Sequence, residues 1–238
     1  MHQWHEEFVS AGVPLDSLQD QVNAEEIAPG VFHLTGGTHH SLAVVQERGI
    51  VLAEAPLYPE RSEAILAFLR ARFPQRAVTH VISSHHHTDH SAGLRTFVAL
   101  GTEIVLGRDS ADFFRSEVFR APSRIIADRL AERRARPRLR TVPSQGNVTL
   151  ADAERPLVVQ HVRSSHANDM LITYLPRQKL LFVSDVYSPQ GPFNPVWAGE
   201  LRAALRELQL DVAFIAGAHG AGLATVEDLD RALAAQTR

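Results

Sequence analysis

The six residues His85-His86-His87-Thr88-Asp89-His90 (HHHTDH) decide the fold and the chemistry of this chain. They put four metal-binding side chains and one spare imidazole into a single turn of backbone. Neutral imidazole is the commonest metal ligand in proteins, and a carboxylate beside it suits zinc, iron or manganese. The run therefore indicates half of a metal site.

The flanking segments place this motif at a turn between a strand and a helix. Residues 77–83 (AVTHVIS) are apolar and β-branched, which predicts a strand, whereas residues 91–100 are rich in helix formers. In layered α/β folds functional residues are concentrated on such turns. The motif therefore lies where a functional site is expected.

The rest of the chain predicts two sets of strands, each with flanking helices. The first set is an antiparallel meander over residues 31–35, 41–46 and 50–55, followed by a helix from Pro59 to about residue 73 and a strand over 103–107. The second set covers residues 147–150, 157–162, 170–175 and 179–183, followed by a helix near 198–208 and a strand over 212–216. A last helix begins at Thr225, with Asp228 completing a variant of the capping box. Two packed sheets with helices outside are the expected architecture.

We expect one domain over residues 29–238, preceded by a helical or irregular lead-in over residues 1–28. Within that domain, residues 108–140 carry ten arginines among apolar residues. One interpretation is an arm that attracts anions. The other, which we favour, is an amphipathic helical insertion whose basic face is solvated, because runs of charge usually face water.

Composition narrows the classes of function. The chain has 238 residues, a formal net charge of −3, thirteen histidines and no cysteine, so histidines and carboxylates must carry any metal chemistry. Neither a nucleic-acid nor a membrane partner is expected, and a small-molecule substrate is. The N-terminus lacks a signal-peptide pattern, so we expect a cytoplasmic location, or a periplasmic or secreted one if a signal peptide has been removed. A homodimer is left open.

The spacing inside the motif suits two neighbouring metal ions. His85 and His87 are two residues apart, so on an extended segment their side chains point the same way and can hold one ion. Asp89 and His90 fall on the turn itself, where the chain reverses and can aim them at a second point nearby.

HHHTDH followed by Ser91-Ala92-Gly93 resembles the HxHxDH signature of the metallo-β-lactamase superfamily. The order of the strands is similar to that family's αββα sandwich, over residues 27 to 234. The resemblance implies an α/β fold in which two mixed β-sheets are flanked by helices in four layers.

The resemblance also implies three further ligands, and each candidate stands where an apolar run ends. His166 follows residues 157–162, and His161 is its only rival, but His161 lies inside the strand pattern. With His33 and His80, His161 is expected to be structural. The implied ligands are His85, His87 and His166 for one ion, Asp89, His90 and His219 for the other, and Asp185 between them. His86 is left out as a ligand.

Such a centre implies a hydrolase. Two divalent ions, zinc first with manganese or iron as alternatives, can share a hydroxide and polarise a substrate oxygen, while Asp89 orients that nucleophile or takes up a proton. We expect an ester, lactone, thioester or related acyl substrate. By resemblance to lactonases, Tyr187 is a catalytic candidate that stabilises an oxyanion, and interior packing is its alternative.

Three further residues are candidates for substrate contact. Asn168 follows the third histidine, where many family members have a small-residue turn, and its alternative is an Asx turn. His39 and His40 lie on a hairpin that overhangs the metals in this family's fold, and their alternative is that they are solvated loop histidines.

Other functions of the family remain as alternatives. In its β-lactamases the bridging aspartate is generally replaced, so Asp185 argues against β-lactam hydrolysis, while a phosphodiesterase would use the same site. Mononuclear iron persulfide dioxygenases use the equivalents of His85, His166 and Asp185. A metal-binding protein without catalysis is the third class.

Overall fold

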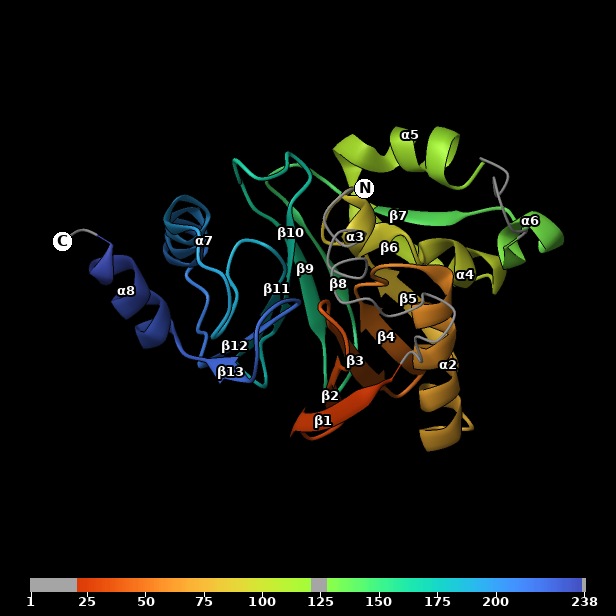
Figure 1. The fold of residues 1–238 in the computed structure, drawn as a ribbon, viewed down its shortest axis with the longest axis horizontal. Helices are drawn as coiled ribbons and strands as arrows, with labels where there is room; N and C mark the ends of the chain where they lie inside the picture. Colours follow the sequence, from red (N-terminus) through yellow and green to blue (C-terminus); the bar gives the residue numbers. More distant parts are fainter. Residues whose placement is uncertain (1–20, 121–127, 237–238) are drawn as a thin grey trace, which may run out of the picture.

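Two β-sheets packed face to face form the centre of the protein in a computed structural model that describes residues 21–120 and 128–236 (Figure 1). The seven-stranded sheet follows chain order: β1 (Asn23–Ala28), β2 (Val31–Thr35), β3 (Ser41–Gln46), β4 (Gly49–Ala53), β5 (Val78–Ile82), β6 (Glu103–Gly107) and β7 (Arg138–Val142). Strands β1 to β4 are antiparallel and β4 to β7 are parallel.

The second sheet has six strands in the order β13-β12-β11-β10-β9-β8. They are β8 (Asn147–Leu150), β9 (Leu157–His161), β10 (Leu171–Leu175), β11 (Leu180–Val183), β12 (Phe214–Gly217) and β13 (Leu223–Ala224). All neighbours are antiparallel except β11 and β12, which are parallel. Both sheets are therefore mixed.

Helices cover the outer faces of the two sheets (Figure 1). Helices α2 (Pro59–Arg72), α4 (Leu94–Ala99) and α6 (Arg129–Arg133) lie outside the seven-stranded sheet, and α7 (Pro195–Glu207) and α8 (Val226–Ala235) outside the six-stranded one. The short helix α3 (Thr88–Ser91) carries the end of the histidine motif. The predicted four-layer sandwich is confirmed. Across the described ranges, no helix is both long and apolar enough to cross a membrane.

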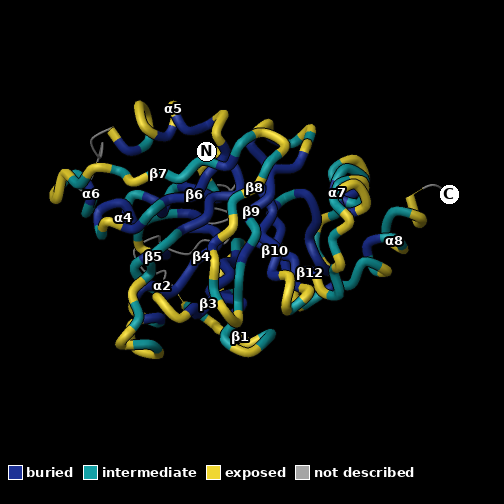
Figure 2. The backbone as a smooth tube through the Cα atoms, turned by 180° about the vertical axis from the view of Figure 1, so that it is seen from behind, coloured by how far each residue is buried: buried dark blue, intermediate teal, exposed yellow. Residues whose placement is uncertain are grey.

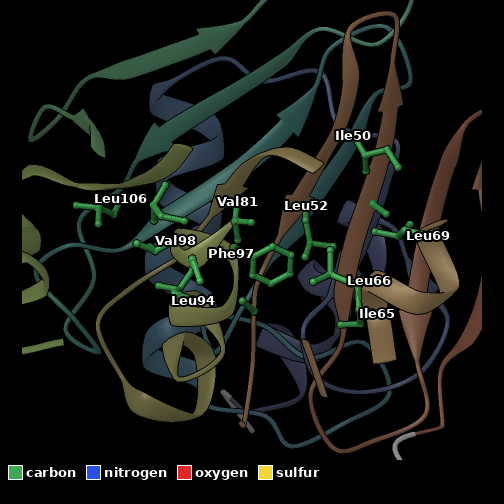
Figure 3. Close-up of a cluster of buried hydrophobic side chains, with 14 of the residues drawn as sticks. Ile50, Leu52, Ile65, Leu66, Leu69, Val81, Leu94, Phe97, Val98 and Leu106 are labelled. Carbon is green, nitrogen blue, oxygen red and sulfur yellow. The ribbon is translucent and has the colours of Figure 1, made fainter. Parts of the chain in front are cut away.

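Three layers of buried apolar side chains lie between these elements. One lies under α2 and α4, where Phe97 packs among aliphatic residues such as Ile65 and Val81 (Figure 3). A second fills the space between the sheets, and a third lies under α7 and α8. Figure 2 shows the central strands buried along their length. Strands covered on both faces read as continuous apolar runs, as β4 does.

Two expectations about chain organisation were wrong in part. Residues 23–28 are not lead-in but strand β1, which pairs with β2 at the edge of the sheet; residues 1–20 lie outside the described part. The arginine-rich stretch is not one helix, because it begins with the short turns η2 (Arg108–Ser110), α5 (Ala111–Phe113) and the π-helical η3 (Phe114–Val118).

The arginine-rich stretch ends in strand β7, which is the last strand of the seven-stranded sheet. Residues 121–127 are not described. Several arginines of the stretch are bound by carboxylates: Arg115 by Asp112, Arg129 by Glu63, and Arg140 by Glu103. The charge of these three arginines is thus neutralised locally.

The parallel pairs explain where a site can form. Because parallel neighbours end at the same edge of a sheet, β4 and β5 end side by side, and so do β11 and β12. The backbone N–H of Leu171 donates to Ser84 O at 2.7 Å and links the two sheets at this edge. The residues that follow these four strands are therefore brought together.

Candidate metal centre

Four side chains form what we call the first histidine group: His85, His87, His166 and Asp185. His85 and His87 follow β5, His166 follows β9, and Asp185 follows β11. One ligand atom of each lies within 4.8 Å of the others. His85 Nε2 and His166 Nε2 are 3.3 Å apart, and the two rings come from different sheets. The sequence prediction named all four.

The second histidine group consists of His39, His90 and His219, whose ligand atoms also lie within 4.8 Å of one another. His90 is on α3, His219 follows β12, and His39 comes from the loop between β2 and β3. His219 Nε2 is 3.2 Å from His90 Nε2. Asp89 Oδ2 lies 3.2 Å from His39 Nε2 and 3.7 Å from His90 Nε2.

Asp185 joins the two groups through its two carboxylate oxygens. Its Oδ2 lies 2.7 Å from His166 Nε2 and 3.3 Å from His85 Nε2, both of the first group. Its Oδ1 lies 2.7 Å from His219 Nε2 and 3.1 Å from His90 Nε2, both of the second. Each oxygen therefore faces a different set of imidazoles.

These atoms fit metal ions of the zinc type. Tetrahedral ligands at about 2.0–2.1 Å from a zinc ion are roughly 3.3 Å apart. Two distances between Nε2 atoms match this value: 3.3 Å between His85 and His166, and 3.2 Å between His90 and His219. Imidazole with carboxylate is also a donor set for manganese and iron. The donor atoms thus suit divalent cations, with zinc among them.

The nitrogens that face away from the groups have partners of their own. His85 Nδ1 is hydrogen-bonded to Ser84 Oγ at 2.9 Å, His90 Nδ1 donates to Glu54 Oε2 at 2.5 Å, and His219 Nδ1 donates to Thr38 O at 3.3 Å. Because a carboxylate and a carbonyl only accept, His90 and His219 carry a proton on Nδ1, and Nε2 is the nitrogen that faces the group. The Ser84 hydroxyl holds the orientation of the His85 ring.

The surroundings of the imidazoles shift their pKa values in opposite directions. Burial lowers the pKa of His85 and of His39, and burial together with the neighbouring imidazoles of His85 and His166 lowers the pKa of His87 to about 4. Burial also acts to lower the pKa of His90, but Glu54 and Asp185 outweigh it and raise that pKa to about 10. In the metal-free protein, His90 is therefore protonated at neutral pH.

The carboxylates stay ionised for the complementary reason. Burial opposes the charge of Asp185, but hydrogen bonds from His166, His219, His85 and His90 hold its pKa far below the usual range. Burial likewise opposes the charge of Asp89, and the hydrogen bond from His39 holds that pKa well below normal.

Sequence reasoning missed Glu54, the residue directly after β4. It is buried, its Oε1 accepts the backbone N–H of Ser84 at 2.8 Å, and its Oε2 accepts from His90. Its φ of 71° lies in the left-handed region, which is costly for a residue with a side chain. An acidic residue ending an apolar run was the available signal.

The substrate candidates have different surroundings. His39 belongs to the second group, so the alternative of a solvated loop histidine was wrong for it. His40 is buried with its ring 5.0 Å from that of His33, and burial followed by His33 lowers its pKa to about 4. It faces the interior. Asn168 is exposed, and its carbonyl accepts from His161 Nε2 at 2.9 Å.

Tyr187 lies outside both groups. It is buried in the apolar layer under α7 and α8, with its ring 6.4 Å from Phe193. Burial and then the charge of Asp228 on α8 raise its pKa. This is the interior packing that was the alternative to a catalytic role.

The histidines expected to be structural have structural partners. His33 Nε2 donates to Gly217 O at 2.9 Å, and His80 Nε2 lies 3.1 Å from Glu103 Oε2. His161, the rival of His166, accepts at Nδ1 from the backbone N–H of Gln145 at 3.1 Å. Its ring is thus occupied away from the first group.

Comparison with known proteins agrees with the fold. Three solved structures superimpose on the chain: the metallo-β-lactamases of Pontibacter korlensis (18% identity, 92% of this chain and 100% of that one, TM-score 0.70) and Hirschia baltica (18%, 90% and 96%, 0.65), and the mono-zinc FIM-1 enzyme of Pseudomonas aeruginosa (15%, 91% and 96%, 0.66). At these identities the likeness shows the fold alone.

A curated relative and a family model extend this to the sequence. The 2,4-dinitroanisole O-demethylase subunit alpha of Nocardioides sp. is 22% identical over 208 residues, which are 85% of this chain and 59% of the relative. The chain thus spans about three fifths of that relative's length. The model of the metallo-beta-lactamase superfamily matches residues 56–219, more than half of the chain. The chain therefore belongs to the metallo-β-lactamase superfamily.

Proposed function

We propose that the chain is a metal-dependent hydrolase that cleaves an ester, lactone, thioester or related acyl substrate at two divalent ions, zinc by preference. One ion would be held by His85, His87 and His166, the other by Asp89, His90 and His219, with Asp185 between them. The observation that carries this proposal is Asp185, because each of its oxygens faces a different histidine group. A single-ion site needs no second group.

The second group also includes His39, which the sequence suggested as a substrate contact. Its Nε2 is within hydrogen-bond distance of Asp89 Oδ2. We propose that His39 is a further ligand of the second ion or holds Asp89 in place beside it.

When bound, two divalent ions supply a water activated at neutral pH and polarise the substrate oxygen. The chain's own groups do the rest. Asp89, whose side chain is 42% exposed, has its Oδ2 3.2 Å from His39 Nε2 and 3.7 Å from His90 Nε2 of the second group. Because its pKa is depressed, it accepts a hydrogen bond and orients the attacking water rather than storing a proton. The buried His85 and His90 are anchored by Ser84 and Glu54 and keep the site rigid.

The test combines metal analysis with a panel of substrates. Purified protein should contain two zinc, manganese or iron ions per chain and should hydrolyse chromogenic esters, lactones or thioesters in preference to β-lactams and bis-phosphodiesters. Asp89→Ala should lose that turnover. One iron per chain with oxygen uptake on a persulfide would establish the dioxygenase instead. No turnover by either protein would favour a metal-binding protein without catalysis.

The curated relative adds a second candidate, since its name describes O-demethylation of 2,4-dinitroanisole. An activated methyl ether belongs in the same panel. Release of methanol from 2,4-dinitroanisole without ester turnover would replace the acyl substrate by an ether.

A further inference from the structure

A continuous row of rings crosses the rim of the first histidine group. The centroid of Phe113 lies 6.2 Å from that of His86, His86 lies 4.9 Å from His87, His87 lies 4.7 Å from His166, and His166 lies 4.4 Å from Trp197. We call these five residues the ring row. Its ends come from α5 and α7, which Figure 1 shows as separate helices of the molecule.

One end of this row is an exposed apolar side chain. Among the described residues, three large hydrophobic side chains are exposed: Phe113 (45%), Val196 (59%) and Phe214 (47%). Phe113 is one end of the row, beside the histidine side chains, whereas Val196 and Phe214 are not part of it. Single exposed apolar side chains are ordinary, but apolar groups gathered beside a polar centre are typical of ligand sites.

The second ring of the row, that of His86, is held by a buried carboxylate. His86 is the one histidine of the HHHTDH motif that is not a proposed metal ligand. Its Nδ1 lies 2.8 Å from Asp169 Oδ1. Asp169 is only 3% exposed. Its position requires a glycine at residue 107, because a Cβ there would lie 2.8 Å from Asp169 Cβ and 2.9 Å from Asp169 O. A half-exposed ring is thus held in one orientation.

The geometry of the row suits an aromatic ligand. Its neighbouring rings meet edge to face, with interplanar angles of 79°, 71°, 78° and 68° along the row. Edge-to-face contact at centroid distances of about 4.5–7 Å is a favoured arrangement of aromatic rings. A further ring laid along the row would meet both faces and edges.

We propose that the ring row binds a flat aromatic substituent of the substrate and so sets the specificity of the site. This inference rests on the proposed function, since the row lies against His87 and His166 of the first group. Phe113 and Trp197 supply the apolar contact, and Asp169 acts as a positioning residue through His86. An alkyl or charged substituent would gain less from these contacts.

Two hydroxamates test the proposal, because they share one metal-binding group and differ in a phenyl ring. Benzohydroxamate should bind the metal-loaded protein about 10-fold or more tightly than acetohydroxamate, and the tryptophan fluorescence should respond to the phenyl compound in the unmodified protein but not in Trp197→Leu. Phe113→Ala and Trp197→Leu should each reduce this ratio by about threefold or more, with the metal content unchanged.

Phe214→Ala is the matched control, because Phe214 is as exposed as Phe113 but starts β12, at the opposite end of that strand from His219. It should leave the ratio unchanged. If Trp197→Leu fails to fold by circular dichroism, Phe113→Ala decides the question. A ratio near one in the unmodified protein, or equal losses in Phe113→Ala and Phe214→Ala, would overturn the proposal.

The two proposals can fail separately. Phenyl preference that depends on the row, without turnover of any acyl substrate, would leave the aromatic site standing and remove the hydrolase. Acyl turnover without phenyl preference would leave the hydrolase standing and remove the aromatic site.

Discussion

The first and second histidine groups share Asp185 but hold their imidazoles by different means. In the first group, a neutral hydroxyl, that of Ser84, anchors His85. In the second, the buried carboxylate of Glu54 anchors His90 and keeps it protonated in the metal-free protein. A metal ion must displace a proton to bind His90, whereas the rings of His85 and His87 are already neutral. The second group is therefore the more sensitive to pH.

Removing the carboxylate of Asp185 should have the largest effect, because both histidine groups share it. Asp185→Ala is expected to reduce bound metal in both groups and to lower acyl hydrolysis by on the order of 10³-fold or more. Elemental analysis and initial rates measure this. Asp112→Asn, which changes an exposed carboxylate paired with Arg115, is the control. Full metal occupancy with an unchanged rate in Asp185→Ala would refute the bridging role.

Removing an imidazole from one group at a time should show that each group holds its own metal ion. His85→Ala should lose the ion of the first group and His219→Ala that of the second, each with a loss of rate on the order of 10²–10³-fold. Each variant is expected to retain about one ion per chain in elemental analysis. Loss of both ions from both variants would mean that the groups do not bind independently.

The affinity of the two groups should respond differently to pH. Between pH 6 and pH 8 the folded protein keeps His90 protonated, since its pKa is raised to about 10, but His87 neutral, since its pKa is lowered to about 4. Protonation of His90 should therefore weaken metal binding at the second group by about 10-fold for each unit that the pH falls, a dependence that His87 does not add at the first group. Chelator competition at several pH values measures both constants, and equal slopes would contradict this prediction.

Changing the anchoring residue of the second group should reduce the difference in pH dependence between the two groups. Glu54→Gln removes the charge that raises the pKa of His90, and Ser84→Ala removes the hydroxyl beside His85. Each is expected to cost roughly 10–100-fold in metal affinity of its own group. Glu54→Gln should also flatten the pH dependence of the second group, which Ser84→Ala should leave intact. If Glu54→Gln leaves the pH dependence of metal binding at the second group unchanged, Asp185 alone keeps His90 protonated.

The smallest effect is expected at Tyr187, which lies outside both groups. Because its ring is buried under α7 and α8, Tyr187→Phe should keep the metal content and the rate within about twofold. A drop of tenfold or more in the turnover number with the Michaelis constant unchanged would restore Tyr187 as an oxyanion donor.

Local patterns predicted the elements of the fold well. The apolar run before the histidines predicted β5, and Thr225 with Asp228 predicted the start of α8, where the structure has a full capping box. Such signals depend on neighbours in the chain. Strand β1 escaped because its residues are mostly exposed and it is held by pairing with β2, and β7 escaped because its arginines resemble a solvated face.

For the candidate site, the sequence by itself predicted the candidate ligands and their order along the chain. The composition and spacing of the HHHTDH motif indicated its own ligands, and the family resemblance implied His166, Asp185 and His219. Only the tertiary structure decided that His39 joins the second group, that His40 and Tyr187 turn inward, and that Glu54 anchors His90. It also decided that Phe113 and Trp197 end one row of rings. These relations depend on side chains far apart in sequence, and those of Glu54, His90 and His219 meet because two parallel strand pairs end at the same edge of the sandwich.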